Sequence, residues 1–297
     1  MPRRPRFDDD EPRRLRISQP AVQLDYSDED IPGGGDRWST WDLPAAGDRG
    51  PQPHPDWLVT DLGAVDQELG VLKTGKEADV HLLWRGVPDQ DKACLLAAKR
   101  YRDGQHRLFH RDVSYQEGRR VRGSREMRAM QKRTGFGRQV MAGQWARAEF
   151  EVLGQLWQLG AAVPYPVQIL GTELLMEFVG DPDGTAAPRL AELPARGQQL
   201  APLWTQLLDM LVLLARSGLA HADLSAYNLL VHRDRLVMID LPQAVDVIAN
   251  PQGRAFLDRD AANVAIWFAA HGLAGADPQA LAELLRAEAG LGLGPAR

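Results

Sequence analysis

The sequence predicts an α+β protein in which a small, antiparallel, β-rich lobe precedes a helical lobe. Short segments of alternating apolar residues, separated by glycine-bearing turns, occupy residues 68–101. Leucine-rich segments of helical length follow after Leu190. Strands first and helices later are typical of α+β folds. A chain of 297 residues with 44% hydrophobic side chains can also bury a substantial core.

The composition excludes several classes of protein. The formal net charge is −5, and charged residues make up 25% of the chain, as in ordinary globular proteins. Cys94 is the single cysteine, which rules out an intramolecular disulfide and a cysteine-based zinc cluster. No run approaches 18 apolar residues, and the arginine-rich start lacks the apolar centre of a secretory signal. We therefore expect no membrane partner and a cytoplasmic location.

Residues 1–55 are predicted to form a disordered acidic tail. They are rich in Pro, Gly and Asp and poor in aliphatic residues. Residues 1–66 carry 14 acidic side chains against 8 arginines. The Trp38–Trp41 stretch leaves docking onto the folded part as an alternative. Order is expected to begin near Trp57, where apolar residues follow at helical spacing (Leu58, Leu62 and Val65).

An N-terminal lobe is predicted over residues 56–179. Its expected elements are three strands of a β-meander at 68–72, 78–84 and 93–101, a helix at 140–159, and a hairpin of strands at 167–170 and 173–179. Residues 100–139 carry 11 Arg and 1 Lys against 4 acidic side chains, a net charge of +8. Their apolar periodicity is poor, which predicts a long, flexible, basic loop, and loops of this length are usually functional.

A helical C-terminal lobe is predicted over residues 180–297. A Pro/Gly-rich connector at 181–188 leads into it. Its expected elements are a helix at 198–217, a loop at 221–228, two short strands at 229–232 and 236–239, and two closing helices at about 252–271 and 278–289.

The segment Gly70–Glu77 (GVLKTGKE) nearly matches the phosphate-binding pattern G-x4-G-K-[ST]. We reject that interpretation because Glu77 offers no hydroxyl to a magnesium ion. The following residues also alternate like a strand, whereas a P-loop must open a helix. A strand–turn–strand arrangement instead covers phosphates from above, as in kinases. An ordinary hairpin turn is the alternative.

Lys99 lies in an apolar strand segment, LLAAKRY. By strand parity it shares a face with Ala97 and Tyr101. A lysine in such surroundings needs an acidic partner or a phosphate, because an unpaired buried ammonium is very costly. Kinases place such a lysine on the third strand and pair it with a glutamate of the next helix. Glu149 is the expected partner and Glu151 the second choice, while a lysine that reaches solvent from a sheet edge is the alternative.

The loop HADLSAYN and the strand after it carry the strongest chemical signal. Asp223 and Asn228 have the D-x4-N spacing of a phosphoryl-transfer loop, and Asp240 ends a hydrophobic strand 12 residues later. In-line phosphoryl transfer needs a carboxylate that orients the attacking hydroxyl. It also needs the oxygen ligands that Mg²⁺ prefers. His221 is expected to brace the loop rather than act as a base.

Several of these segments resemble the RIO family of atypical protein kinases. They are TGKEADV from Thr74, the strand lysine Lys99, HADLSAYN from His221, DLPQAV from Asp240, and RAFLDRDAANVAIWF at Arg254–Phe268. The resemblance covers about residues 68–270. It implies a two-lobed protein-kinase-like fold with ATP between the lobes. It also implies a mobile loop between the strand lysine and the next helix, and no extended activation segment.

The resemblance further implies roles for individual residues. Asp223 would be the catalytic aspartate, and Lys99, paired with Glu149, would hold the α- and β-phosphates. Asn228 and Asp240 would bind the metal, Mg²⁺ or alternatively Mn²⁺. The remaining residues would surround the nucleotide, with Thr74, Gly75 and Lys76 over the triphosphate, Met176 at the edge of adenine, and the backbone of Glu177 and Phe178 bound to it.

The sequence departs from the family pattern at three positions. Lys73 stands where Ser or Gly is common, His81 where Tyr is common, and Ala226 where Glu is common. The chain holds only 5 lysines beside 30 arginines. Two of the five, Lys76 and Lys99, fall where kinase chemistry requires a lysine, and Lys73 lies beside the same turn.

The function expected is that of an ATP- and Mg²⁺-dependent serine/threonine protein kinase of RIO type, which phosphorylates a protein hydroxyl or itself. One alternative is a RIO-type ATPase switch that binds RNA or ribosomal particles through the basic loop 100–139. The other is a small-molecule kinase, although such kinases usually carry Gly where this loop has Ala222.

Overall fold

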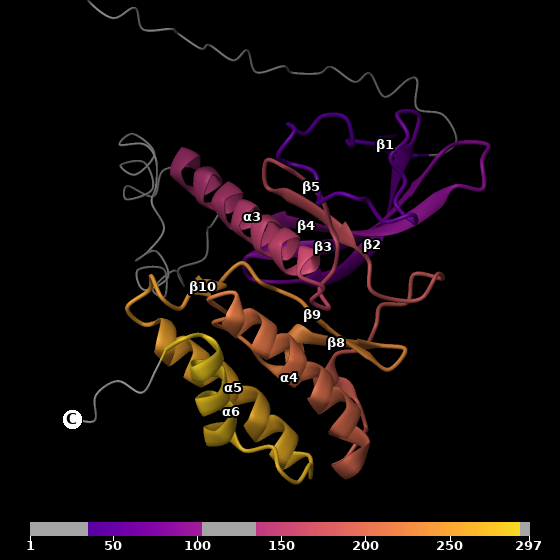
Figure 1. Ribbon diagram of the computed structural model, residues 1–297. Helices are drawn as coiled ribbons and strands as arrows, with labels where there is room; N and C mark the ends of the chain where they lie inside the picture. The colour runs from indigo at the N-terminus through magenta and orange to yellow at the C-terminus, as the bar shows by residue number, and fades with distance from the viewer. Residues whose placement is uncertain (1–34, 103–134, 292–297) are drawn as a thin grey trace, which may run out of the picture. The chain divides into compact units, whose positions relative to one another are not determined.

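The computed structural model describes residues 35–102 and 135–291, with side chains from Val140 onward in the second range (Figure 1). The chain divides into two units, residues 1–30 and 31–297, and every described residue belongs to the second. The expected basic loop lies outside the described residues at 103–134. Residues 100–101 end a strand, and residues 135–139 begin a helix.

A six-stranded antiparallel sheet forms the N-terminal part of this unit. Its spatial order is β1-β2-β3-β4-β6-β5. The strands are β1 (Arg37–Trp38), β2 (Val65–Thr74), β3 (Ala78–Gly86), β4 (Ala93–Tyr101), β5 (Pro166–Leu170) and β6 (Glu173–Glu177). The predicted meander and hairpin are confirmed, since β2, β3 and β4 pair in order and β5 pairs with β6.

Helix α3 (Gly135–Gln158) lies along one face of the sheet (Figure 1). Its apolar side buries Ala146, Phe150, Leu153 and Leu156 in the larger hydrophobic core. On β4, Ala97 and Tyr101 point into the same core. The helix predicted at 140–159 is therefore present and begins five residues earlier.

The other face of the sheet is covered by residues 35–64. Leu96 and Ala98, which alternate with the α3-facing residues of β4, pack in a second core with Trp41 and Leu58. The backbone of Gly50 also donates to the Val167 carbonyl at 2.9 Å. The prediction of disorder up to residue 55 is thus wrong for residues 35–55. The docked alternative for Trp38–Trp41 is correct for Trp41, which is 8% exposed. Residues 1–34 lie outside the described residues.

One feature explains this difference. The segment 35–64 has few aliphatic residues, but large buried side chains such as Trp41 and Leu58 anchor it to the sheet. One aromatic side chain buries as much apolar area as several small ones, so few anchors are enough. The helix expected from Trp57 onward is also wrong. Residues 56–64 form turns, and Val65 begins β2, where it pairs with Trp38 of β1.

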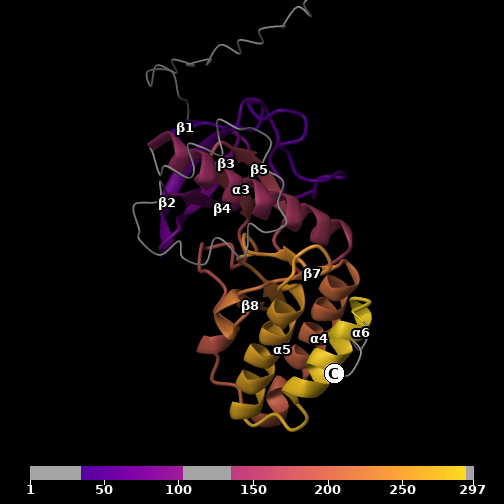
Figure 2. The same ribbon diagram turned by 90° about the vertical axis from the view of Figure 1, so that its left-hand side faces the viewer.

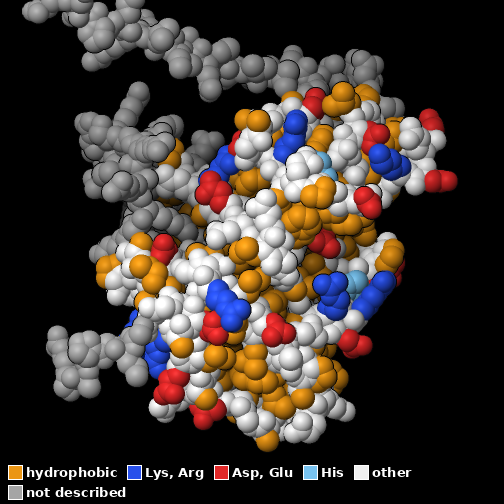
Figure 3. Space-filling model, in the orientation of Figure 1, with side chains coloured by type: hydrophobic (Ala, Val, Ile, Leu, Met, Phe, Trp, Pro, Cys, Tyr) orange, Lys and Arg blue, Asp and Glu red, His pale blue; other side chains and the backbone are white. Residues whose placement is uncertain are grey.

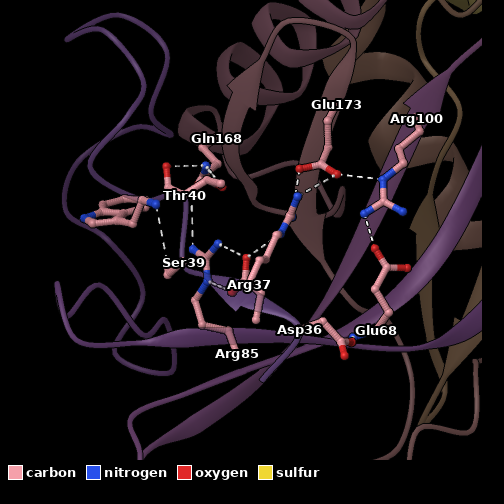
Figure 4. Close-up of polar contacts among 11 residues, drawn as sticks. Asp36, Arg37, Ser39, Thr40, Glu68, Arg85, Arg100, Gln168 and Glu173 are labelled. Atoms are coloured by element: carbon pink, nitrogen blue, oxygen red, sulfur yellow. Dashed lines mark hydrogen bonds and ion pairs between the residues drawn. The ribbon is translucent and has the colours of Figure 1, made fainter. Parts of the chain in front are cut away.

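A chain of ion pairs ties β1 to strands β2, β3, β4 and β6 (Figure 4). Arg85 donates to both carboxylate oxygens of Asp66, at 2.7 and 3.0 Å, and both side chains are fully buried. Arg37 bonds Glu173 at 2.9 Å, and Glu173 in turn accepts from Arg100 at 2.7 Å. Arg100 also bonds Glu68 of β2. These contacts fix the strand that precedes the predicted phosphate-covering turn.

Three helices dominate the C-terminal part: α4 (Ala201–Arg216), α5 (Gly253–Ala270) and α6 (Pro278–Glu288). They pack against one another (Figure 2). Two small antiparallel pairs accompany them, β8 (Leu229–His232) with β9 (Arg235–Met238), and β7 (Leu219–Ala220) with β10 (Val245–Asp246). The predicted helices and the β8–β9 strands are confirmed within three residues, whereas the two-residue strands β7 and β10 were not foreseen.

Only residues 241–252 separate Asp240 from helix α5, and they contain the short strand β10. The chain therefore has no extended activation segment at this place. On the face seen in Figure 3, basic and acidic side chains of the described residues are interspersed. Among the described residues, no helix has the length and apolarity that a membrane span requires.

Candidate active site

A cavity of about 730 Å³ lies between the sheet and the C-terminal part. Strands β2, β3 and β4 contribute Lys73, Val80 and Lys99 to its wall, the turn between β2 and β3 contributes Gly75 and Lys76, and α3 contributes Glu149. Residues Met176–Val179, Ala186–Arg189, Asp223 and Ile239–Asp240 line the other sides. Most of the predicted site residues therefore surround one cavity. Asn228 and Thr74 are outside its lining.

Lys99 is the most strongly paired cation of the cavity. Its Nζ lies 2.8 Å from Glu149 Oε1 and 2.7 Å from Asp240 Oδ1. Burial alone would lower the pKa of Lys99, but the two carboxylates outweigh it and hold the pKa above its usual value. The expected Lys99–Glu149 ion pair is confirmed, and the alternative of a solvent-reaching edge lysine is wrong. Glu151, the second choice, is exposed.

Glu149 makes two further hydrogen bonds from its buried position on α3. Its Oε2 accepts from the Tyr101 hydroxyl at 2.5 Å, and its Oε1 accepts from the Leu241 backbone N–H at 3.1 Å. The side chain is only 1% exposed. One carboxylate thus joins β4, α3 and the segment after Asp240. Strand parity already placed Tyr101 on the Lys99 face, but nothing in the sequence indicated its bond to Glu149.

Asp240 follows β9 with a left-handed backbone, at a φ of 68°. A left-handed residue that is not glycine is uncommon and concentrates at functional sites. The positive charge of Lys99 lowers the pKa of Asp240 to about 2, against the opposing effect of burial. Its carboxylate is 36% exposed. Asp240 is therefore ionised at neutral pH and accessible from the cavity.

The loop 221–228 is held by hydrogen bonds from its side chains to backbone carbonyl groups. Asn228 Nδ2 donates to the Asp223 carbonyl at 2.9 Å, which fixes the distance between these two residues. The His221 ring bonds the Ile239 carbonyl at 3.1 Å, so His221 braces the loop as expected. Ala222 adopts a φ of 67°. Asp223 lines the cavity at the end of this constrained turn.

Asp260 of α5 supports the same loop from below, a role that the sequence did not reveal. Its carboxylate is 2% exposed and accepts from the backbone N–H groups of Ala222 at 2.7 Å and Leu224 at 3.0 Å. Burial raises the pKa of Asp260. Asn263, one turn later, donates to the Leu224 carbonyl at 3.0 Å. The sequence signal that could have revealed this role is the position of Asp260, an acidic residue among the apolar residues on the buried side of α5.

The turn between β2 and β3 confirms the strand–turn–strand arrangement. The Gly75 N–H donates to the Ala78 carbonyl at 2.9 Å and closes the turn. A Cβ on Gly75 would lie 2.8 Å from that carbonyl oxygen, so the turn requires glycine. Gly75 and Lys76 line the cavity together with Lys73, whereas the Thr74 side chain is exposed and outside the lining.

The end of β6 and Phe178 after it form the segment where the sequence predicts an adenine base. Met176 is 8% exposed and pairs with Ala97 across β4 and β6. The Glu177 N–H donates to the Tyr165 carbonyl at 2.8 Å, so this donor is already used within the protein. Glu177 and Phe178 nevertheless line the cavity. A base bound here would meet the remaining backbone groups of this segment.

The family model of the RIO domain matches residues 92–281, which is more than half of the chain. The chain belongs to the RIO family. The fold and family expected from the sequence are thereby confirmed.

Named relatives of this RIO protein are kinases. It is 35% identical over 233 residues to the RIO-type serine/threonine-protein kinase Rio1 of Haloferax volcanii, an alignment that covers 78% of this chain and 73% of the relative. It is 30% identical over 230 residues to the serine/threonine-protein kinase RIO1 of Saccharomyces cerevisiae, which covers 71% of this chain and 46% of the yeast protein. The expected enzyme class, a RIO-type protein kinase, is confirmed.

A solved structure shows the same fold. The Rio2 kinase of Chaetomium thermophilum, in a complex with ADP/Mg²⁺ and phosphoaspartate, superposes with a TM-score of 0.53 at 18% identity. The match covers 76% of this RIO chain and 66% of the Rio2 chain. At this identity the comparison establishes the fold, which is the two-lobed kinase arrangement with the cavity between its lobes.

Proposed function

We propose that this protein transfers the γ-phosphoryl group of ATP to a serine or threonine hydroxyl of a protein, with Mg²⁺ as the metal. One observation carries this proposal. Lys99 and Asp240 form an ion pair in the same cavity that Asp223 lines, and Asn228 is bonded to the Asp223 carbonyl. Phosphoryl transfer depends mainly on positioning and on charge stabilisation, which such a fixed set provides.

The nucleotide site follows from the cavity wall. We assign adenine to the segment Met176–Phe178 and the triphosphate to the β2–β3 turn at Gly75 and Lys76, beside Lys99. Thr74 enters this assignment through its backbone, since its side chain is exposed away from the cavity lining. The Rio2 kinase structure described above is a complex with ADP and Mg²⁺, and it supports this assignment by analogy.

The residues present fit a hard divalent cation. Asp240 offers an ionised, partly exposed carboxylate. Asn228 uses its amide nitrogen to bind the Asp223 carbonyl, so its Oδ1 is the atom that remains for a metal. Mg²⁺ prefers such oxygen ligands together with phosphate and water, and Mn²⁺ accepts the same set. When bound, the ion would neutralise phosphate charge. Lys99 contacts Oδ1 of Asp240, so Oδ2 is the oxygen of Asp240 that would remain for the ion.

Asp223 is the residue that we assign to the attacking hydroxyl. Asn228 binds the backbone carbonyl of Asp223. Asp260 accepts from the backbone N–H groups of the two neighbours, Ala222 and Leu224. A carboxylate held in this way orients the hydroxyl and accepts its proton as the bond from the hydroxyl oxygen to the γ-phosphorus forms and the bond from that phosphorus to the leaving ADP oxygen breaks. The positioning comes from the loop rather than from a second catalytic base.

A second candidate function is a RIO-type ATPase switch that binds RNA or ribosomal particles. The net charge of +8 in residues 100–139 favours an anionic partner. A gel-shift assay of the whole chain at low salt tests this partner, and no retardation of RNA would contradict it. A cytoplasmic location belongs to both proposals, because ATP is supplied there.

Incubation with γ-labelled ATP and Mg²⁺ separates these functions. Wild type is compared with Asp223→Asn and Asp240→Asn, with Asp209→Asn on α4 as a control outside the cavity. Label on a protein hydroxyl, lost in both site variants and kept in the control, supports the kinase. Free phosphate without protein label supports the ATPase, and label on an added aminoglycoside or choline supports a small-molecule kinase. Equal turnover in all four proteins would show that the assigned site is wrong.

A further inference from the structure

Lys73 is a cavity cation for which the family assignment gives no role. It lies near the end of β2, opposite Val80 of β3, and its side chain is half-buried. It lines the same cavity as Asp240 and Lys99. Within the residues that the structure describes, its ammonium has no hydrogen bond and no ion pair. A half-buried ammonium without a counter-ion is costly, which points to a ligand that supplies negative charge.

Lys99, the buried lysine of the cavity, cannot by itself balance the negative charge of a nucleotide. Lys99 already contacts two carboxylates, Glu149 and Asp240, at 2.8 and 2.7 Å. Its positive charge is therefore largely neutralised by the protein. A triphosphate brings several negative charges into the cavity and needs other cations. Lys73 and Lys76 are the two further lysines of its lining.

Arg189 faces the same cavity from the connector to the C-terminal part. Burial lowers the pKa of Lys73, Asp240 opposes this effect, and the positive charges of Arg189 and Lys99 lower the pKa further. Lys73 is thus within electrostatic reach of Arg189. Lys73 on β2 and Arg189 on the connector line one cavity, where their like charges repel one another, and an anion between them would relieve that repulsion.

We propose that Lys73 of β2 and Arg189 of the connector form a phosphate-binding pair that holds the phosphates of the bound nucleotide in the cavity. This inference rests on the proposed binding of ATP in this cavity. It assigns part of the phosphate affinity to Lys73, where the family pattern has a small residue. Phosphate recognition is then stronger than Lys76 and Lys99 alone would give, because charged hydrogen bonds to phosphate are among the strongest in proteins.

Equilibrium binding of ADP and adenosine to the whole chain tests the proposal without turnover. In Lys73→Ser and in Arg189→Ser we expect ADP to bind roughly tenfold more weakly, while adenosine affinity stays unchanged. Lys73→Arg should restore most of the ADP affinity, because it restores the charge. Lys92→Ser is the matched control, since Lys92 pairs with Asp61 on an exposed loop outside the cavity lining.

Two results would overturn the proposal that Lys73 and Arg189 bind phosphate. Unchanged ADP affinity in Lys73→Ser, or an equal loss for ADP and adenosine, overturns the proposal. Thermal unfolding identifies a variant that fails to fold, and Lys73→Gln, which keeps the length of the side chain, then replaces it. A wild type that binds ADP but transfers no phosphate contradicts the proposed function and leaves this inference intact. A wild type that binds no adenine nucleotide contradicts both.

Discussion

The Lys99 ammonium lies 2.7 Å from the Asp240 carboxylate, so a strand of the sheet is joined directly to the residue that follows β9. Glu149 holds the same ammonium from helix α3 and also accepts from the Leu241 N–H. Lys99 and Glu149 lie 50 positions apart along the chain, and Glu149 and Leu241 lie 92 positions apart. Their contact is the point at which the two lobes share charged side chains.

This contact predicts a pH dependence of stability. The pKa of Asp240 is about 2 in the folded protein, below its ordinary value of 3.8. A lowered carboxyl pKa contributes stability that is present above about pH 4 and is lost as the pH falls through 2. We therefore expect the difference in unfolding free energy between wild type and Asp240→Asn to shrink over that window. Urea denaturation between pH 2 and pH 6 measures it.

The control for this experiment is Asp209→Asn on α4, an exposed residue outside the cavity lining. Its difference from wild type should stay nearly constant between pH 2 and pH 6. A wild-type advantage over Asp240→Asn that is as large at pH 2 as at pH 6 would mean that the Lys99 contact does not stabilise the ionised form of Asp240.

Glu149→Gln should reduce both activity and stability. The substitution removes one of the two charges that hold Lys99 and weakens the bond to Tyr101, so Lys99 would shift in the cavity. Misplacement of such a group by about 1 Å costs roughly a hundredfold in rate, which we expect in kcat/KM. Glu151→Gln, two residues away and exposed, should match wild type. Equal kinetics for both variants would show that Glu149 does not position Lys99.

The buried pair of Arg85 and Asp66 predicts a large stability effect far from the cavity. Both side chains are fully buried. Arg85→Leu leaves Asp66 with only Arg37 at 3.4 Å and should cost about 3–5 kcal/mol. The double variant Arg85→Leu/Asp66→Leu should lose much less, because no buried charge is left unpaired. Chemical denaturation measures all three free energies of unfolding.

A surface pair of similar geometry serves as the comparison. Arg216 and Glu288 lie 2.6 Å apart, but Arg216 is 63% exposed. Arg216→Leu should change the free energy of unfolding by less than about 1 kcal/mol. Similar losses for Arg85→Leu and Arg216→Leu would contradict the dependence on burial.

Asp260→Ala should impair catalysis through the loop that carries Asp223. Two backbone N–H groups, of Ala222 and Leu224, would lose their acceptor, at about 1–3 kcal/mol for each buried donor. We expect kcat to fall at least tenfold while the KM for ATP changes little, because the nucleotide wall is untouched. Asp260→Asn keeps an acceptor oxygen and should recover part of the activity. Asp258→Ala, on the same helix and more exposed, is the control.

The sequence was sufficient to predict the strands and helices whose apolar residues repeat regularly within one element. The meander β2–β4, helix α3 and helices α4–α6 follow from side-chain patterns within one element. The partner of Lys99 was also predictable, because an ammonium in an apolar strand needs a carboxylate. The ordered segment 35–55 was not, since its stability depends on a sheet face formed by distant residues such as Leu96 and Val167.

The sequence by itself determined which chemistry the chain carries. The D-x4-N spacing of Asp223 and Asn228, the terminal Asp240 and the strand Lys99 are local patterns that belong to phosphoryl transfer. Only the tertiary structure decided how these residues are used: that Lys99 holds two carboxylates, that Asp260 supports the loop, and that Lys73 faces the cavity beside them. The reason is physical. Spacing along a chain fixes the face of an element, whereas pairing and burial depend on which faces meet.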